Sequence, residues 1–389
     1  MALPRANTAH DDVLAHLGQP GSTSLIATPA LVCDVDLLIA NVQGMASATT
    51  KAGIALRPHT KTHKSAFIAR QQLDAGAIGL SFAKLSEAET IIEQLIDDGL
   101  TNRVSTLLTS VVTGPAAATR LAALAPRCDL VVVVDHVDGV TELSDALRAS
   151  DATITVLCDV DVGQRRSGVV SPNDAVTLVA HVAAAPQLLF GGVQGYGGQL
   201  QHIAGREERR RAAFESARRL EDVITALEEA GHDVVLRTGG GTGTTLIDIE
   251  IGVLNEVQPG SYVFMDREYR DALGDDPEGA FAQSLTIATT VVSANQERFV
   301  TVDAGYKAMA TDAGPPAIVG YEGSAEFHFS SDEQGIVTNP SHSPFRRGQR
   351  LTLVPPHCDP TVDKYDVIWL VRGDVVIDAF DVTARGRSQ

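Results

Sequence analysis

Residues 79–108 read GLSFAKLSEAETIIEQLIDDGLTNRVSTLL, and the order of patterns in this stretch decides the fold class. The short apolar runs Gly79–Phe82 and Ser105–Leu108 have the length and composition of β-strands. Between them, Leu85–Ile96 places apolar residues at helical spacing, with polar residues on the opposite side. A strand, a helix and a second strand in this order indicate a βα unit of a parallel sheet.

The same alternation runs from about residue 50 to residue 265, with a strand roughly every 25 to 35 residues. Ala212–Glu229 is a second clear amphipathic helix. The predicted strands are Ile54–Arg57, Gly79–Phe82, Ser105–Leu108, Leu130–Val134, Ile154–Asp159, Leu188–Val193, Val234–Thr238 and Glu256–Tyr262. Eight βα units predict an α/β protein with a (β/α)8 TIM barrel over residues 45–270.

After about residue 280 the pattern changes to the period of two that is typical of half-buried strands. The predicted strands here are Ser284–Val292, Arg298–Val302, Leu351–Val354, Val367–Val371 and Val375–Ala379. Ala30–Asp34 is an extra strand before the barrel, and we expect it to join this sheet. Residues 1–44 and 271–389 therefore form a predicted second, smaller β domain, which suits a chain of 389 residues.

Composition and charge exclude several classes of function. The net charge of −18 would repel nucleic acids and anionic lipids. No apolar run approaches the roughly 18 residues of a membrane span, and the first 25 residues lack the basic start and apolar core of a secretory signal. The four cysteines are widely spaced and do not form a disulfide pattern. We therefore expect a cytoplasmic protein with no nucleic-acid or membrane partner.

The first predicted barrel strand runs into the basic segment RPHTKTHK, residues 57–64. Side chains alternate along a strand, so four of them should share one face: Arg57, His59, Lys61 and His63. Barrels place reactive groups at the carboxyl ends of their strands. A nearby cation such as Arg57 would lower the pKa of Lys61 and make it a better nucleophile toward an aldehyde. A solvated basic loop is the alternative, and spacing alone does not decide between the two.

A glycine-rich loop follows the seventh predicted strand. Residues 238–245 read TGGGTGTT, and Gly260 and Ser261 close the eighth strand. Glycines let the backbone approach a phosphate group, while amides and threonine hydroxyls donate hydrogen bonds to it. Because barrels often bind phosphate after strands seven and eight, a phosphate site is favoured over a plain turn.

Two further loops at the same end of the barrel carry polar groups. The loop DVDVGQRRSG, residues 159–168, contains Arg166, which could bind an anionic oxygen, although paired arginines after a strand are more often surface charges. The loop QGYGGQ, residues 194–199, offers Tyr196, which alone would be interpreted as a core residue.

A candidate metal site follows the predicted strand Leu351–Val354, in the segment PPHCDPT, residues 355–361. In an extended segment His357 and Asp359 face the same side and Cys358 faces away. An imidazole and a carboxylate together suit Mg, Mn or Zn. Two such residues also occur close together by chance, and a confirmed site needs a full ligand set.

Together these motifs resemble the fold-type III pyridoxal-phosphate enzymes, which have an alanine racemase-like barrel. Within them the chain is similar to the group of D-threonine aldolase, D-3-hydroxyaspartate aldolase and D-serine dehydratase. The resemblance runs from Thr28 to the end of the chain. The stretches that carry it are residues 57–64, 163–168, 238–242, 258–262 and 357–359.

The resemblance implies pyridoxal 5'-phosphate as the cofactor, bound to Lys61 as a Schiff base. It implies that Arg166 lies near the phenolic oxygen and that Gln258 faces the pyridine nitrogen, where a neutral amide would make the ring a weaker electron sink than an aspartate would. His59 would support the ring or the substrate carboxylate. The other implied cofactor contacts are Tyr196, Thr238, Gly240, Gly241, Thr242, Gly260 and Ser261.

The resemblance also implies a divalent metal on His357 and Asp359, with Mn or Mg favoured over Zn. The dehydratase branch typically has a cysteine in the place of Asp359, so the aspartate favours an aldolase. Such an enzyme cleaves a β-hydroxy-D-amino acid to glycine and an aldehyde, with a metal-bound hydroxide or His63 as the base.

Several alternatives stay open. One is a dehydratase that acts on D-serine or D-3-hydroxyaspartate and releases ammonia and a keto acid, and another is a non-catalytic barrel that binds the cofactor. D-Threonine, D-phenylserine and D-3-hydroxyaspartate are all possible aldolase substrates. The resemblance further implies a head-to-tail homodimer, in which the β domain of one chain covers the barrel of the other. His357 and Asp359 would then reach Lys61 from the partner chain, and a site completed within each chain is the alternative.

Overall fold

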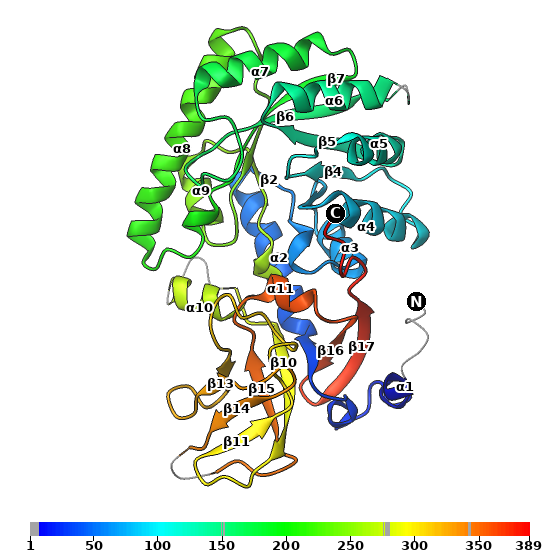
Figure 1. Ribbon diagram of the computed structural model, residues 1–389, viewed down its shortest axis with the longest axis vertical. Helices are drawn as coiled ribbons and strands as arrows, with labels where there is room; N and C mark the ends of the chain where they lie inside the picture. The colour runs from blue at the N-terminus through cyan, green and yellow to red at the C-terminus, as the bar shows by residue number, and fades with distance from the viewer. Residues whose placement is uncertain (1–7, 149, 151, 275, 277–280, 341–343) are drawn as a thin grey trace.

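Two β-sheets organise the chain, with the barrel in the upper half of Figure 1 and the second sheet in the lower half. The structure is a computed structural model, and it describes residues 8–148, 150, 152–274, 276, 281–340 and 344–389. The upper sheet has eight strands in the order β2-β9-β8-β7-β6-β5-β4-β3. The lower sheet has nine strands within the described part of the chain.

The predicted (β/α)8 barrel is confirmed. Neighbouring strands of the upper sheet are parallel, and the barrel closes where His59 and Ser81 form a parallel bridge. The strands are β2 (Ala55–Leu56), β3 (Leu80–Phe82), β4 (Ser105–Leu108), β5 (Asp129–Val134), β6 (Ile154–Asp159), β7 (Leu188–Gly195), β8 (Leu236–Gly239) and β9 (Glu256–Val257).

The last barrel strand is much shorter than predicted. The prediction of a strand from Glu256 to Tyr262 is wrong after Val257, because the neighbouring strand β8 ends where Gly239 pairs with Val257. Without a partner the chain turns instead, and Ser261–Val263 form the 3-10 helix η5.

Helices follow the barrel strands and cover the outside of the barrel (Figure 1). The two predicted helices are confirmed as α4 and α8. In α4 the buried side chains of Ile91 and Leu95 pack into the core cluster around the barrel strands. The helices are α3 (Ala66–Asp74), α4 (Leu85–Asp97), α5 (Pro115–Leu124), α6 (Val137–Arg148), α7 (Pro172–Ala184), α8 (Arg206–Glu229), α9 (Thr245–Ile251) and α10 (Arg267–Leu273).

The second sheet includes the strand before the barrel, as predicted. This strand, β1, pairs antiparallel with β10 and parallel with β16. Three short strands, β12, β13 and β14, were not predicted. The strands are β1 (Ala30–Asp34), β10 (Leu285–Ser293), β11 (Phe299–Val302), β12 (Ala317–Ile318), β13 (Phe327–Phe329), β14 (Gly335–Thr338), β15 (Arg350–Val354), β16 (Val367–Arg372) and β17 (Val375–Asp381).

Helix α2 (Val35–Ala52) connects the two sheets. The Asp34 carboxylate caps it by accepting from Asp36 N and Leu37 N, each at 3.0 Å. Its buried face belongs to a core cluster that contains residues of both sheets, such as Val257 and Leu353. The shared core keeps helix α11 (Cys358–Val362) against the loop that follows β2, which matters for the site.

Two smaller expectations concern the whole chain. No helix in the described residues is both long and apolar enough to span a membrane. All four cysteines are buried and free, as predicted: Cys33, Cys128, Cys158 and Cys358.

Candidate active site

The basic segment after β2 turns sharply instead of continuing as a strand. Thr60–Thr62 form the 3-10 helix η2. The turn is stabilised because Thr60 O accepts from His63 N at 3.1 Å and from Lys64 N at 2.8 Å. The prediction that Arg57, His59, Lys61 and His63 share one face of a strand is therefore wrong, although His59 and Lys61 still line one cavity.

Arg57 is buried and does not act on Lys61. Its Nε and Nη2 each donate to the Glu256 carboxylate at 2.9 Å, and its Nη1 donates to Ser105 Oγ at 2.7 Å. The charge of Arg57 is thus balanced by a carboxylate within the barrel. The prediction that Arg57 lowers the pKa of Lys61 is wrong.

Lys61 instead lies against Asp359 of α11. The Lys61 ammonium forms an ion pair with the Asp359 carboxylate, whose other oxygen accepts from Ser261 Oγ at 3.4 Å. Burial alone would lower the pKa of Lys61, but the carboxylate outweighs burial and raises it above its usual range. Burial would likewise raise the pKa of Asp359, but Lys61 and His357 together hold it below its usual range.

Lys61 and Asp359 therefore meet within one chain. The hypothesis that the metal pair reaches Lys61 from the partner subunit is wrong for this pair, because the core around α2 already brings the two regions together.

His59 is held in one tautomer. Its Nδ1 accepts from Lys61 N at 3.3 Å, so its Nε2 carries the proton and donates to Thr109 Oγ1 at 3.0 Å. Burial lowers the pKa of His59 to about 3. The imidazole is neutral and its edge has no free lone pair, although it still lines the same cavity as Lys61.

His63 is completely buried and is also fully hydrogen bonded. Its Nδ1 accepts from Ser65 N at 3.1 Å, so its Nε2 donates to Gln72 Oε1 at 3.3 Å. Burial lowers its pKa to about 4. Because neither ring nitrogen can accept a further proton without breaking a hydrogen bond, the geometry contradicts the prediction of His63 as the base.

His202, which the sequence interpretation missed, has the free nitrogen that His63 lacks. It lies after the 3-10 helix η4 (Gly198–Leu200), with Nδ1 3.4 Å from Glu268 Oε1 and its ring 4.5 Å from that of Tyr269. Its buried Nε2 has no hydrogen-bond partner among the described residues. Burial lowers the pKa of His202, and the charges of His357, Asp359 and Lys61 also act on it. The only sequence clue was its place in the loop after the sixth barrel strand, where reactive groups gather.

The two glycine-containing loops predicted to bind phosphate lie together. Thr242 Oγ1 accepts from Tyr262 N at 3.0 Å, which joins the loop after β8 to the loop after β9. A Cβ at Gly260 would lie 2.7 Å from Thr62 Oγ1 and 3.1 Å from His59 O. The Thr62 hydroxyl is buried and helps to lower the pKa of Asp359. A narrow cradle of glycine backbone and threonine hydroxyls fits a phosphate group.

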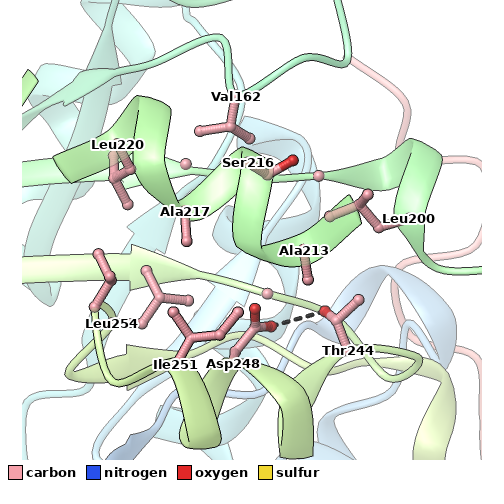
Figure 2. Close-up of a pocket in the computed structure, with 14 residues that line it drawn as sticks. Val162, Leu200, Ala213, Ser216, Ala217, Leu220, Thr244, Asp248, Ile251 and Leu254 are labelled. Carbon is pink, nitrogen blue, oxygen red and sulfur yellow. Dashed lines mark hydrogen bonds between the residues drawn. The ribbon is translucent and has the colours of Figure 1, made fainter. Parts of the chain in front are cut away.

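Behind the glycine-rich loop after β8, α8 and α9 enclose a cavity of about 30 Å³ (Figure 2). Its walls are mostly apolar, for example Leu220 and Ile251. Its polar lining residues include Asp248, which accepts from Thr244 Oγ1 at 2.7 Å and would collide with a Cβ at Gly240. Burial raises the pKa of Asp248 to about 7. Gly240, with φ of 69°, is thus required for both its conformation and its space.

Side chains predicted from separate strands line one cavity beside Lys61. They include Arg166, whose guanidinium carbon lies 5.6 Å from the centre of the Tyr196 ring. Gln258 reaches the same cavity from the loop after β9. A cation, an aromatic ring, an amide and an amine around one cavity fit the polar edges and the flat ring of a pyridoxal cofactor.

The candidate metal pair lies at the start of α11. The predicted extended segment is wrong after His357, because Cys358 and Asp359 belong to the helix and His357 is its N-cap. His357 Nδ1 lies 2.7 Å from Asp312 Oδ2, which leaves its Nε2 free. A carboxylate on the second nitrogen is the usual partner of a metal-binding histidine. Burial would lower the pKa of His357, but Asp359 and Asp312 outweigh it and raise the pKa.

The described residues contain no group of three or more His, Cys, Asp or Glu that could hold a metal. A metal on His357 and Asp359 would therefore keep several positions for solvent or substrate, as catalytic sites do. Cys358 is buried and its backbone N donates to Asp266 at 2.8 Å.

The chain matches two known domain families. Residues 33–268 match the alanine racemase N-terminal domain, and residues 284–371 match the putative serine dehydratase domain. The chain is 37% identical to a D-threonine aldolase of an Arthrobacter species, over 95% of this chain and 96% of that protein. It is 34% identical to a 3-hydroxy-D-aspartate aldolase of Paracoccus denitrificans, over 94% and 93% of the two chains.

A solved structure is also similar. The crystal structure of the D-threonine aldolase from Filomicrobium marinum superposes with a TM-score of 0.89 at 34% identity, over 94% of this chain and 98% of the other.

Proposed function

Because the chain belongs to the alanine racemase-like family that includes D-threonine aldolase and 3-hydroxy-D-aspartate aldolase, we propose that it is an aldolase dependent on pyridoxal 5'-phosphate and a divalent metal. It cleaves a β-hydroxy-D-amino acid of the D-threonine type into glycine and an aldehyde. One observation carries the proposal: the amine of Lys61 and the carboxylate of Asp359 meet within one chain, beside the imidazole of His357.

The residues around Lys61 hold the cofactor. Lys61 binds its aldehyde group, and Arg166 binds its phenolic oxygen as the cation that lines the same cavity. When bound, pyridoxal phosphate withdraws electrons from the Cα atom of an amino acid and stabilises the negative charge left there by cleavage. The phosphate contacts come from Gly240, Gly241, Thr242, Gly260 and Ser261.

His357 and Asp359 hold the metal. An imidazole and a hard carboxylate favour Mn or Mg, with Zn less favoured. A divalent metal there lowers the pKa of the substrate's β-hydroxyl group. Asp312 would fix the His357 ring by accepting from Nδ1, so that Nε2 is left free to bind a metal.

His202 removes the proton from the β-hydroxyl group. Nδ1 of His202 lies 3.4 Å from Glu268 Oε1, a carboxylate that favours the proton on Nδ1 and so leaves the lone pair to the unpartnered Nε2. Burial lowers the pKa of His202, so the ring is neutral near pH 7 and can accept a proton. His202 thus replaces His63 in the role that the sequence interpretation gave to the latter.

Dehydration is the second candidate, and Cys358 is the feature that would favour it. In this chain the Cys358 thiol is buried and donates to Asp359 Oδ1 at 3.4 Å, and it is the Asp359 carboxylate, not the thiol, that meets Lys61. A non-catalytic barrel would have no use for a free His202 or for the metal pair. Both considerations favour the aldolase.

The remaining features of the proposal concern the assembly. The barrel domain comprises residues 45–270, and the β domain comprises residues 1–44 and 271–389. The protein acts as a cytoplasmic homodimer on a small-molecule substrate, and its charge of −18 disfavours nucleic acids and membranes.

The test is product analysis with the purified protein, pyridoxal phosphate and Mn. D-Threonine, D-phenylserine and D-3-hydroxyaspartate should each be incubated, with L-threonine as the control. We expect glycine and an aldehyde from the D-substrates and little ammonia. EDTA should abolish turnover but leave the cofactor absorbance, because Lys61 and the phosphate loop hold the cofactor. Ammonia and a keto acid as main products, or full activity without metal, would refute the proposal.

A further inference from the structure

The amide of Gln258 is held in one orientation by the hydrogen bonds behind it. Gln258 Nε2 donates to Thr238 Oγ1 at 2.8 Å and to Gln194 Oε1 at 3.4 Å. Both N–H groups of the amide are thereby used. The oxygen and the nitrogen of the Gln258 amide can be told apart by their hydrogen-bond partners. What Thr238 and Gln194 can accept and donate therefore decides which end of the amide faces the cavity.

Thr238 can only accept from Gln258. Its single hydroxyl proton goes to Glu256 Oε1 at 2.8 Å. Glu256 is an ionised carboxylate, because Arg57 donates to both of its oxygens. A carboxylate has no proton to return, so the lone pairs of the Thr238 hydroxyl remain for the amide N–H of Gln258.

Gln194 also can only accept from Gln258. Its Nε2 donates to Thr109 O at 3.0 Å and to Asp159 Oδ1 at 2.9 Å, so both of its own N–H groups are used. Only its carbonyl oxygen is left for Gln258. A flipped Gln258 amide would place an oxygen against the Gln194 carbonyl and against the lone pairs of Thr238, and would lose both hydrogen bonds.

The Gln258 carbonyl oxygen therefore remains for the cavity. It makes no hydrogen bond to any described residue, and Gln258 lines the cavity that also contains Lys61 and Arg166. Among the residues that line the cavity, Arg166 is a cationic donor and Gln258 Oε1 is an acceptor.

We propose that Gln258 accepts a hydrogen bond from the ring nitrogen of the cofactor and so holds that nitrogen protonated. This inference rests on the proposed function only in taking pyridoxal phosphate as the ligand. Apart from its aldehyde and phosphate, the cofactor has two polar ring positions. The phenolate oxygen is an acceptor and needs Arg166, whereas the nitrogen can bind Gln258 Oε1 only as N–H. Thr238, Gln194, Glu256 and Arg57 are then positioning residues.

The orientation of the amide refines the expectation drawn from the sequence, which compared a neutral amide with an aspartate. An amide that presents its carbonyl oxygen favours the cationic ring, which is the stronger electron sink, over the unprotonated ring. It does so less strongly than the negative charge of an aspartate would.

The first experiment measures the ring nitrogen directly. The protein is loaded with pyridoxal phosphate labelled with 15N in the ring, and the 15N chemical shift is followed across neutral pH. We expect the shift of a protonated nitrogen in the wild type and in Gln258→Glu, which keeps an acceptor. Gln258→Leu should show the unprotonated shift. Thr238→Val should lie between them, because the amide is then free to turn.

A second experiment uses affinity and needs no turnover. The apoprotein is titrated with pyridoxal phosphate and with its analogue that has carbon in place of the ring nitrogen. The analogue should bind on the order of tenfold more weakly to the wild type, as expected for one lost charge-assisted hydrogen bond. Gln258→Leu should bind the two alike.

The outcomes separate the two proposals. An unprotonated ring nitrogen in wild type that holds the cofactor on Lys61 would overturn this inference and leave the aldolase proposal intact. Failure to bind the cofactor at all would overturn both.

Discussion

At the scale of single residues, the chemistry depends on which histidine keeps a free lone pair. The sequence offered His59 and His63 because both flank Lys61. In the structure, both nitrogens of each ring are hydrogen bonded. His59 bonds to Lys61 N and Thr109 Oγ1, and His63 bonds to Ser65 N and Gln72 Oε1. Hydrogen bonds of this kind come from tertiary contacts, and no spacing rule along the chain could have predicted them.

The first prediction tests His202 as the base. His202→Gln should lower kcat by about 10²- to 10⁴-fold, the usual contribution of a general base, because Gln cannot accept the proton. The affinity for pyridoxal phosphate should stay unchanged, since the cofactor contacts lie elsewhere. The matched control is His181→Gln, a change on the exposed surface of α7. A His202→Gln enzyme with wild-type kcat would reject this role.

At the scale of elements, the barrel was predictable and the ends of its strands were not. Buried strands such as Ile154–Asp159 were predicted with their observed bounds, because each is a continuous apolar run. The turns that form the site, η2, η5 and the start of α11, were all predicted as extended. At η5 the chain turns because the neighbouring strand β8 has ended, and that depends on pairing across the sheet.

A second prediction concerns the space at the start of η5. Gly260→Ala should weaken the binding of pyridoxal phosphate by on the order of tenfold or more, because the new Cβ would lie 2.7 Å from Thr62 Oγ1 and close to the His59 carbonyl. Equilibrium titration of the apoprotein measures the effect. Gly139→Ala in α6 is the control, since a Cβ there meets nothing within 4 Å. It should be neutral or slightly stabilising. Equal affinities for the two variants would contradict the cradle.

The third prediction is that Asp248, in α9, makes the free energy of unfolding depend on pH. Burial raises the pKa of Asp248 from 3.8 to about 7. A carboxyl group whose pKa is raised in the folded state contributes stability that is fully present below its unfolded pKa and is lost as the pH rises through about 7. Wild type should therefore lose stability over this range relative to Asp248→Asn, by about 4 kcal/mol at most.

Urea unfolding of both proteins at about pH 5 and about pH 8 measures this difference. Asp248→Asn keeps an acceptor for Thr244 and removes the titrating group. The free energies of unfolding of the two proteins should therefore be closer at about pH 5 than at about pH 8. A gap between the proteins that does not change with pH would show that Asp248 does not titrate in the folded state.

At the scale of the whole molecule, the question is whether one chain can complete a site. The sequence assigned Lys61 and Asp359 to different domains and so invited an arrangement in which two subunits share them. Helix α2 and its common core remove that need, because α11 contacts η2 of the same chain. A dimer is still expected, but it is not what joins this pair.

The last prediction follows from this arrangement. Lys61→Ala and Asp359→Ala subunits, each inactive, should remain inactive after they are mixed and exchanged, because no chain then carries both residues.

Mixing equal amounts of wild type with the double variant gives the opposite test. If each chain completes its own site, the exchanged mixture should have about half of the activity of wild type at the same total concentration. If the site were shared across a dimer, only wild-type homodimers would be active, and the mixture should have about one quarter of that activity. Subunit exchange must be verified with a tagged chain. Recovery in the first mixture, together with a fall to a quarter in the second, would show that the pair meets between chains.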